Sequence, residues 1–204
     1  MLIANIYDLI MSQPEAHCLG EWRSELLSQA RGRVLEIGAG TGINLGHYTD
    51  EVDELVLLEP DETMRTKLHD RADQCAAKQI TYANDFIEKY DAPDHSFDFI
   101  VCTLVLCSVP DPTTALAAFK RLLKPDGKYI FIEHVASERG TTARKLQNTL
   151  DPVWKFCAGN CHLTRETERT IAASGFAIEE IARDTLCWAP SALFPTIRGV
   201  ASPT

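Results

Sequence analysis

The chain has little positive charge, and it contains no long apolar run, no internal repeat and no low-complexity segment. Its 204 residues include 20 Lys and Arg against 29 Asp and Glu, which gives a formal net charge of -9. Contact with nucleic-acid phosphates needs a basic surface, so this balance disfavours long RNA or DNA as a partner. The hydrophobic share of 45% and the charged share of 24% are ordinary for a globular protein.

Neither a secretory leader nor a membrane anchor is evident at the N-terminus. The opening stretch MLIANIYDLIM is interrupted by Asn5 and Asp8 and is far shorter than the roughly 20 apolar residues that span a bilayer. The seven cysteines are an odd number without framework spacing, which predicts reduced thiols and a cytoplasmic location. Cys157, Cys161 and His162 lack the spacing of common zinc sites, so no metal is expected.

From Arg33 onward, strand and helix signals alternate, which predicts one α/β domain with right-handed crossovers and a parallel sheet. A leading helical segment over 2–29 is expected to break near Pro14, because proline interrupts helices. The turn residues Lys124 to Gly127 are expected to end a helix. Strands are predicted at 33–37, 55–58, 80–83, 97–102, 129–132, 176–181 and 197–201, and helices after Gly42 and at 62–76, 112–123, 141–156 and 164–173.

The segment Val34 to Gly42, VLEIGAGTG, carries the strongest functional signal. An apolar strand runs into three alternate glycines, Gly38, Gly40 and Gly42, which leave backbone close to whatever lies above the strand end. A dinucleotide fingerprint needs its third glycine where Ile43 stands, so the register disfavours a nicotinamide dehydrogenase.

Two carboxylates narrow the choice of cofactor. Glu36 precedes the glycines and disfavours a pyrophosphate while favouring a ligand with cationic groups. Glu59 ends the next buried strand, 21 positions after Gly38, where an acid can accept both ribose hydroxyls. S-adenosylmethionine fits, because it has an ammonium, a sulfonium and no phosphate.

Together, the strand, the glycine loop and the terminal acid resemble the class I S-adenosylmethionine-dependent methyltransferases. The resemblance implies a single-domain Rossmann-like fold, with a mostly parallel seven-stranded sheet, an antiparallel last strand and helices on both faces. Residues 1–30 would form a helical lid, 31–135 the cofactor-binding core, and 136–204 the substrate-side helices and last two strands.

The residues expected to touch the cofactor follow the carboxyl ends of the strands, where ligands of such sheets bind. In this family an acid or amide after the third strand binds the adenine amino group, and a methionine after the second strand often packs on the adenine ring. Asp85 and Met64 match these places, although Met64 is equally well explained as a residue that fills the core. The expected cofactor-binding set is Glu36, Gly38, Ala39, Gly40, Gly42, Glu59, Pro60, Met64, Asn84, Asp85, Phe86, Cys102 and Thr103.

Four further segments narrow the resemblance to the methyltransferase-like seven family, the alkyl thiol methyltransferases. They are CTLVLCSV from Cys102, EHVA from Glu133, LDPVW from Leu150 and LTRE from Leu163, within a resemblance that runs from about Val34 to Val200. It implies S-methylation of a small thiol. Members of that family carry a hydrophobic membrane-anchoring segment before the cofactor domain, and none is expected here.

Methyl transfer requires chiefly that the acceptor be held about 3 Å from the methyl group with water excluded. A free thiol has a pKa near 8.5, so modest help from a base or a cation suffices, and His134 is the best-placed candidate catalytic residue. Leu104, Trp154 and Trp188 are candidate walls of the substrate pocket, although packing into an ordinary core explains such residues equally well. Asp98, early in its strand, is expected to be structural.

Two alternatives stay open beside thiol methylation. The acceptor atom could be oxygen, nitrogen or carbon of a small phenol, quinol or amine. The domain could also be a noncatalytic module that binds the cofactor or regulates a partner. The expected partner is a small-molecule methyl acceptor, and the oligomeric state is left open.

Overall fold

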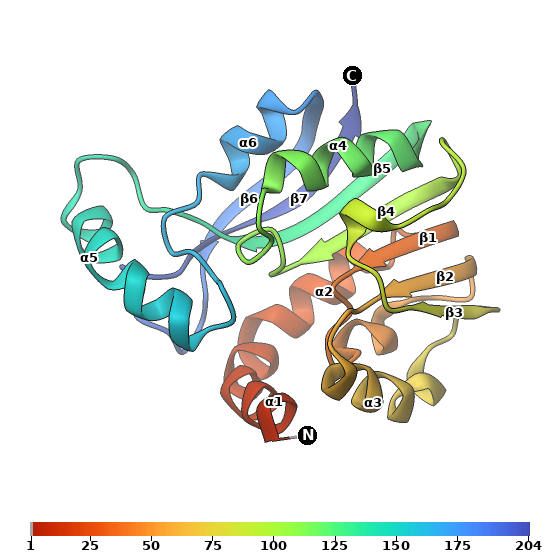
Figure 1. Cartoon of the computed structure of the whole chain (residues 1–204), viewed down its shortest axis with the longest axis horizontal. Coiled ribbons are helices and arrows are strands. Elements are labelled where there is room, and N and C mark those ends of the chain that lie inside the picture. The colour runs from red at the N-terminus through yellow and green to blue at the C-terminus, as the bar shows by residue number, and fades with distance from the viewer. Residues whose placement is uncertain (1) are drawn as a thin grey trace.

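The computed structural model describes residues 2–204, with side chains from Asp8 onward. Seven strands form one sheet in the order β3-β2-β1-β4-β5-β7-β6 (Figure 1). Strands β1 to β5 are parallel to one another, and β7 runs antiparallel to both β5 and β6. The predicted fold class is therefore confirmed. The strands are β1 Gly32–Ile37, β2 Val52–Leu58, β3 Ile80–Ala83, β4 Phe97–Thr103, β5 Leu123–His134, β6 Phe176–Thr185 and β7 Pro195–Pro203.

The helices lie on both faces of this sheet because successive strand side chains point to opposite sides. On one face, Leu26 and Leu27 pack with Val34 and Leu57; on the other, Phe119 packs with Leu35 and its neighbours. The α-helices are α1 Leu2–Pro14, α2 Gly20–Leu27, α3 Glu62–Asp70, α4 Pro112–Leu122, α5 Thr142–Cys157 and α6 Thr167–Ala173. None of the helices described is long and apolar enough to cross a membrane.

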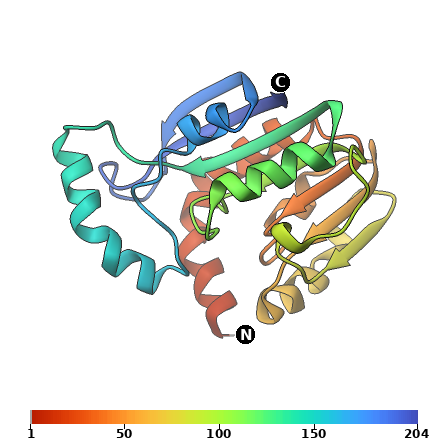
Figure 2. The ribbon, with the colours of Figure 1, turned by 45° about the horizontal axis from the view of Figure 1, so that its top comes forward.

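Helix α5 stands apart from the sheet and from the helices that cover its faces, beyond the carboxyl end of β5, in both views of the ribbon (Figures 1 and 2). Gln147 fastens it to the body: its side-chain oxygen accepts the Ser137 N–H at 2.7 Å, and its nitrogen donates to the Val135 and Leu193 carbonyls. The carboxyl ends of β4 and β5 point toward the side of the molecule on which α5 lies (Figures 1 and 2).

The leading α-helix is interrupted near Pro14 as predicted: α1 ends there, and a π-helical turn, Glu15–Leu19, in which the Gly20 N–H bonds to the Glu15 carbonyl, leads into α2. Two other predictions of local structure were wrong. Lys124 to Gly127 lie within β5 at an irregularity in its pairing with β4. Only a short 3₁₀ turn, Ile43–His47, follows the glycines.

Candidate active site

The glycine loop after β1 has the geometry that its sequence predicts. Gly38, Gly40 and Gly42 have φ values of 63°, 58° and 82°, a region that side chains disfavour. A Cβ on Gly38 would lie 2.6 Å from Val105, and one on Gly42 would lie 2.8 Å from Leu68. A Cβ on Gly40 would meet nothing closer than 3.9 Å, so the space above the middle glycine is open to a ligand.

Glu59, at the end of β2, lies directly beside this open space. Its carboxylate accepts the Gly40 N–H at 2.8 Å and the Asp61 N–H at 2.9 Å, and only 7% of the residue is exposed. Each oxygen keeps a second lone pair for a hydroxyl donor. Burial raises the pKa of Glu59, partly offset by these two backbone hydrogen bonds.

Glu36 lies deeper, under the loop, in a buried polar network. It accepts hydrogen bonds from the Tyr48 hydroxyl at 2.7 Å and the Asn44 amide at 2.9 Å. Arg23 of α2 donates to Asn44 and to Thr103, which joins the ends of β1 and β4. Burial raises the pKa of Glu36 to about 7.

The residues predicted to surround the adenine lie at the same edge, after β2 and β3. Met64 is half-buried in the first turn of α3, whose N-terminus Asp61 caps by accepting two backbone N–H groups. Asn84, Asp85 and Phe86 are exposed directly after β3, and Phe86 is 53% exposed. Pro60 begins the turn between Glu59 and α3, and Ala39 donates its backbone N–H to Leu58 at 3.0 Å.

Asp8 of α1 ties the leading helix to the glycine loop. It accepts the Thr41 hydroxyl at 2.7 Å and forms ion pairs with Lys67 at 2.7 Å and Arg71 at 2.9 Å. Desolvation opposes ionisation of Asp8, but the hydrogen bonds and charges of Lys67, Thr41 and Arg71 leave its pKa lowered. These contacts fix α1 to the glycine loop and to α3.

The segment after β4 is held by hydrogen bonds to β5. Leu104 has a φ of 60°, unusual for a residue with a branched side chain, and donates its N–H to Ile132 at 2.7 Å. Buried Glu133 of β5 accepts the N–H groups of Val105, Leu106 and Cys107 and fixes the loop. The Cys102 side chain is fully buried in the core and forms its sulfur contact with Glu133.

His134, the predicted catalytic residue, ends β5 and is only 4% exposed. Its Nε2 lies 3.5 Å from the Cys161 sulfur, and its Nδ1 is buried without a hydrogen-bond partner. Burial lowers the pKa of His134 to about 4, so the imidazole is neutral near pH 7. The hydrogen bond with Cys107 lowers the pKa of the Cys161 thiol. The same hydrogen bond, together with burial, raises the pKa of the Cys107 thiol.

The two tryptophans predicted as pocket walls occupy different places. Trp154 of α5 packs edge to face on Phe194 at 5.2 Å, and Phe194 also contacts His134 at 5.9 Å, so Trp154 belongs to the surroundings of that histidine. Trp188 is 71% exposed and lies against His17, 5.1 Å between ring centres.

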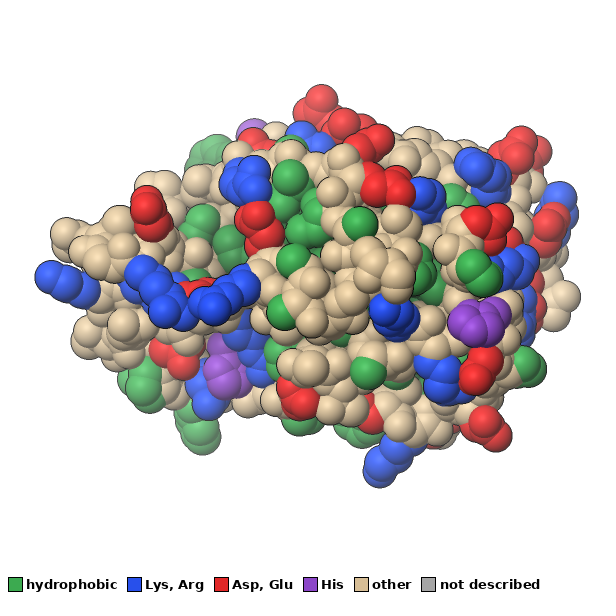
Figure 3. Space-filling model, turned by 90° about the horizontal axis from the view of Figure 1, so that it is seen from above, with side chains coloured by type: hydrophobic (Ala, Val, Ile, Leu, Met, Phe, Trp, Pro, Cys, Tyr) green, Lys and Arg blue, Asp and Glu red, His purple; other side chains and the backbone are tan. Residues whose placement is uncertain are grey.

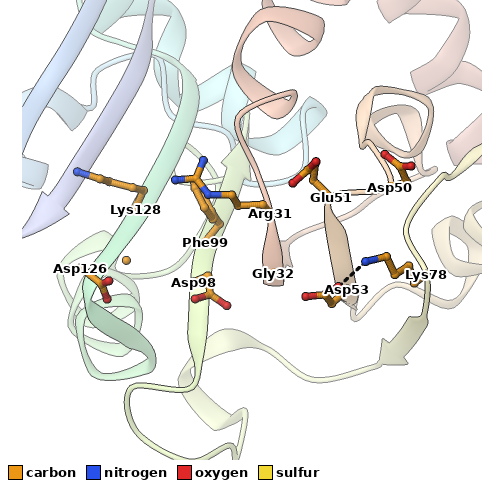
Figure 4. Close-up of a pocket in the computed structure, with 11 residues that line it drawn as sticks. Arg31, Gly32, Asp50, Glu51, Asp53, Lys78, Asp98, Phe99, Asp126 and Lys128 are labelled. Carbon is orange, nitrogen blue, oxygen red and sulfur yellow. Dashed lines mark hydrogen bonds and ion pairs between the residues drawn. The ribbon is translucent and has the colours of Figure 1, made fainter.

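A cavity of 680 Å³ lies at the opposite edge, where the strands begin (Figure 4). It is open and mainly acidic, and Asp53 pairs there with Lys78 at 2.7 Å. Ligands of doubly wound sheets bind at the carboxyl edge, so this cavity is not the cofactor site. Asp98 lies here as expected, accepting the Arg33 N–H at 2.9 Å and pairing with Lys124 at 2.6 Å.

Sequence reasoning missed several residues of the site. Arg23, Asn44 and Tyr48 enclose Glu36, but nothing local in the sequence marks them. Cys157, Cys161 and His162 do not form one group: Cys157 is exposed, and Cys161 lies instead beside Cys107 and His134. On the face shown in Figure 3, acidic and basic side chains are interspersed and form no continuous basic field.

A family model described as a methyltransferase domain matches residues 14–181. The chain is 36% identical to thiol S-methyltransferase TMT1B of Rattus norvegicus over 149 residues, which make up 71% of this chain and 59% of that protein. It is 34% identical to the human protein of the same name over 196 residues, 88% of this chain and 77% of that one. The matched part thus spans less than two thirds of the rat relative.

The fold is also that of solved structures. The N-methyltransferase NodS of Bradyrhizobium japonicum, in complex with S-adenosyl-L-homocysteine, superposes with a TM-score of 0.68 at 18% identity. The match covers 93% of this chain and 87% of that one.

Proposed function

The chain belongs to the methyltransferase domain family, and on that premise we propose that it transfers the methyl group of S-adenosylmethionine to the sulfur of a small-molecule thiol. The observation that carries the choice of thiol is the 34% identity to a thiol S-methyltransferase over 88% of the chain. The segments at the ends of β4 and β5 that carry the resemblance, CTLVLCSV from Cys102 and EHVA from Glu133, lie within the matched domain.

The chain's residues fit the cofactor at the carboxyl edge of β1 and β2. Gly40 leaves open space above the loop, and Glu59 offers lone pairs to ribose hydroxyls beside it. The Glu36 carboxyl lies below the site, and its ionised form, which a bound cation favours, supplies negative charge for a cationic ligand. When bound, S-adenosylmethionine supplies an electrophilic methyl group on a sulfonium.

The chain's part in the reaction is to position the acceptor and exclude water. The acceptor thiol loses its proton, its sulfur forms a bond to the methyl carbon, and the bond from that carbon to the sulfonium breaks. The products are a thioether, S-adenosylhomocysteine and one proton. We place the acceptor beside Leu104 and Thr103, with His134 on its far side. The Leu104 N–H donates to the Ile132 carbonyl, and Arg23 donates to the Thr103 hydroxyl, so both residues are held in place.

Reduced thiols are part of the proposal. All seven cysteines are free in the structure, which supports a reducing compartment such as the cytoplasm. Fractionation of cells that express the full chain, followed by thiol trapping, tests this; a disulfide-linked secreted form would contradict it.

The test of function has two stages. Calorimetric titration with S-adenosylhomocysteine first establishes whether the cofactor binds, and failure to bind at millimolar ligand overturns the proposal. Turnover is then measured on small alkyl thiols beside phenols, quinols and amines of similar size. Turnover of phenols alone would replace thiols with oxygen acceptors, and binding without any turnover would indicate a noncatalytic module.

A further inference from the structure

Three side chains that can ligate a soft metal meet where β4 and β5 end. One sulfur each from Cys107 and Cys161 and one ring nitrogen of His134 all lie within 4.8 Å of one another. The group contains no fourth histidine, cysteine or carboxylate among the residues described. A zinc site with three protein ligands and one open position is the form that catalytic zinc takes.

The spacing of the ligand atoms suits a tetrahedral ion. Zinc binds sulfur at about 2.3 Å and nitrogen at about 2.0 Å, so neighbouring ligands in a tetrahedron lie about 3.5 to 3.8 Å apart. The Cys161 sulfur and His134 Nε2 are 3.5 Å apart. One cation therefore fits between these two atoms, and a small movement brings the third within bonding distance.

The loops that carry the two cysteines are fastened to each other. The His162 N–H donates to the Cys107 carbonyl at 2.9 Å, and the Asn160 side chain donates to Ser108 at 2.7 Å. Arg165 donates to the carbonyls of Leu106 and Val109. The site is thus held in place by backbone contacts that do not involve the ligand atoms themselves.

Buried polar atoms around the cluster lack partners. Neither Nδ1 of His134 nor Nε1 of Trp154 has a hydrogen-bond partner, although both atoms are buried. Such groups cost free energy while they stay unpaired. A metal ion does not satisfy an N–H donor, so the case for the ion rests on the three ligand atoms and their spacing.

We propose that Cys107, His134 and Cys161 bind one Zn²⁺ and that the acceptor thiol occupies its fourth position; the second part rests on the proposed function. Metal binding releases one proton from each of the two thiols, and the neutral imidazole ligates directly, so the loaded site is uncharged. The acceptor thiol then releases its own proton and binds as the thiolate that attacks the methyl carbon. His134 acts here as a ligand, and the cation takes the part first assigned to a base.

The test uses the full chain, reduced and stripped with a chelator. Zn²⁺ is titrated against a chromophoric chelator, and Co²⁺ is added separately to read ligation from its visible and near-ultraviolet absorption. We expect one Zn²⁺ per chain and a Co²⁺ spectrum with thiolate charge-transfer bands. Cys107→Ser, Cys161→Ser and His134→Ala should each weaken Zn²⁺ binding by more than about 100-fold, beyond the loss expected from an outer-shell change.

Cys157→Ser is the matched control, because Cys157 is exposed and lies outside the cluster. It should bind Zn²⁺ as the unsubstituted chain does. Calorimetric S-adenosylhomocysteine binding and the melting temperature of each variant show whether it is folded. The metal site is overturned if all variants, the control included, bind Zn²⁺ equally weakly. It is also overturned if Cys107 and Cys161 form a disulfide that persists after the chain has been treated with reductant.

The acceptor part has its own readout. A small alkyl thiol added to the Co²⁺ form should intensify the charge-transfer bands, and the alcohol of the same length should not. A metal site that ignores the thiol overturns direct ligation, as does full turnover by the stripped chain. If the thiol alters the Co²⁺ spectrum but no acceptor is methylated, the metal site stands and the proposed function fails.

Discussion

Glu59 accepts the backbone N–H of Gly40 at 2.8 Å, so the side chain that directly follows β2 holds the loop that follows β1. Both residues border the open space in which the cofactor is proposed to bind. A Cβ on Gly40 would enter that space and meet no protein atom closer than 3.9 Å.

We therefore expect Gly40→Val to weaken S-adenosylhomocysteine binding at least about 100-fold, or about 2.7 kcal/mol. Gly159→Val is the control, because Gly159 has nearly the same φ, 59° against 58°, and also faces open space. Both substitutions strain the backbone alike, and calorimetry on both separates strain from exclusion. Equal losses in the two variants would contradict the placement of the cofactor.

The ion pairs of Asp8 predict a kinetic effect. Asp8→Asn removes the charge that joins α1 to Lys67 and Arg71, so the cofactor should dissociate several-fold faster while the fold is retained. Stopped-flow displacement of a bound fluorescent cofactor analogue measures the rate. Asp53→Asn, which loses an exposed ion pair with Lys78, should leave it unchanged, and a similar acceleration in both variants would exclude a lid.

Buried Glu36 predicts how stability depends on pH. Its folded pKa is about 7, raised by burial from 4.5, so the folded state binds this proton more tightly than the unfolded state. The resulting stabilisation is present below about pH 4.5 and is lost as pH rises through 7, roughly 2.5 kcal/mol between pH 5 and 8. In urea unfolding without cofactor, Glu36→Gln should lose less stability than the unsubstituted chain over this range. An unchanged pH dependence would show that Glu36 is ionised throughout.

Asp98 is expected to act on stability alone. Asp98→Ala removes the acceptor of the Arg33 N–H and the partner of Lys124, at a cost of about 1 to 2 kcal/mol in the free energy of unfolding. Cofactor affinity should stay within about twofold, because Asp98 lies at the amino edge. A selective loss of affinity in a stable variant would place a function at the cavity of Figure 4.

The sequence predicted the parts of the site whose signals are local. The glycines and Glu36 are neighbours along one segment, and Glu59 ends a strand of recognisable composition, so their placement followed from strand ends alone. The interruption of the leading helix near Pro14 was predicted, but the π-helical form of the turn that follows it was not, because no residue pattern marks such a turn. Cys107, His134 and Cys161 are separated in sequence by 27 residues at each step, and only the packing of two loops against the end of β5 brings them together.

The central claim is that sulfur receives the methyl group, and one competition experiment tests it most directly. The chain is incubated with S-adenosylmethionine that carries a deuterated methyl group and an equimolar mixture of an alkyl thiol, the alcohol, the amine and a phenol of similar size. Mass spectrometry then identifies which product contains the label. We predict labelled thioether as the dominant product, and label in the ether, the amine or the phenol with none in the thioether would contradict the account.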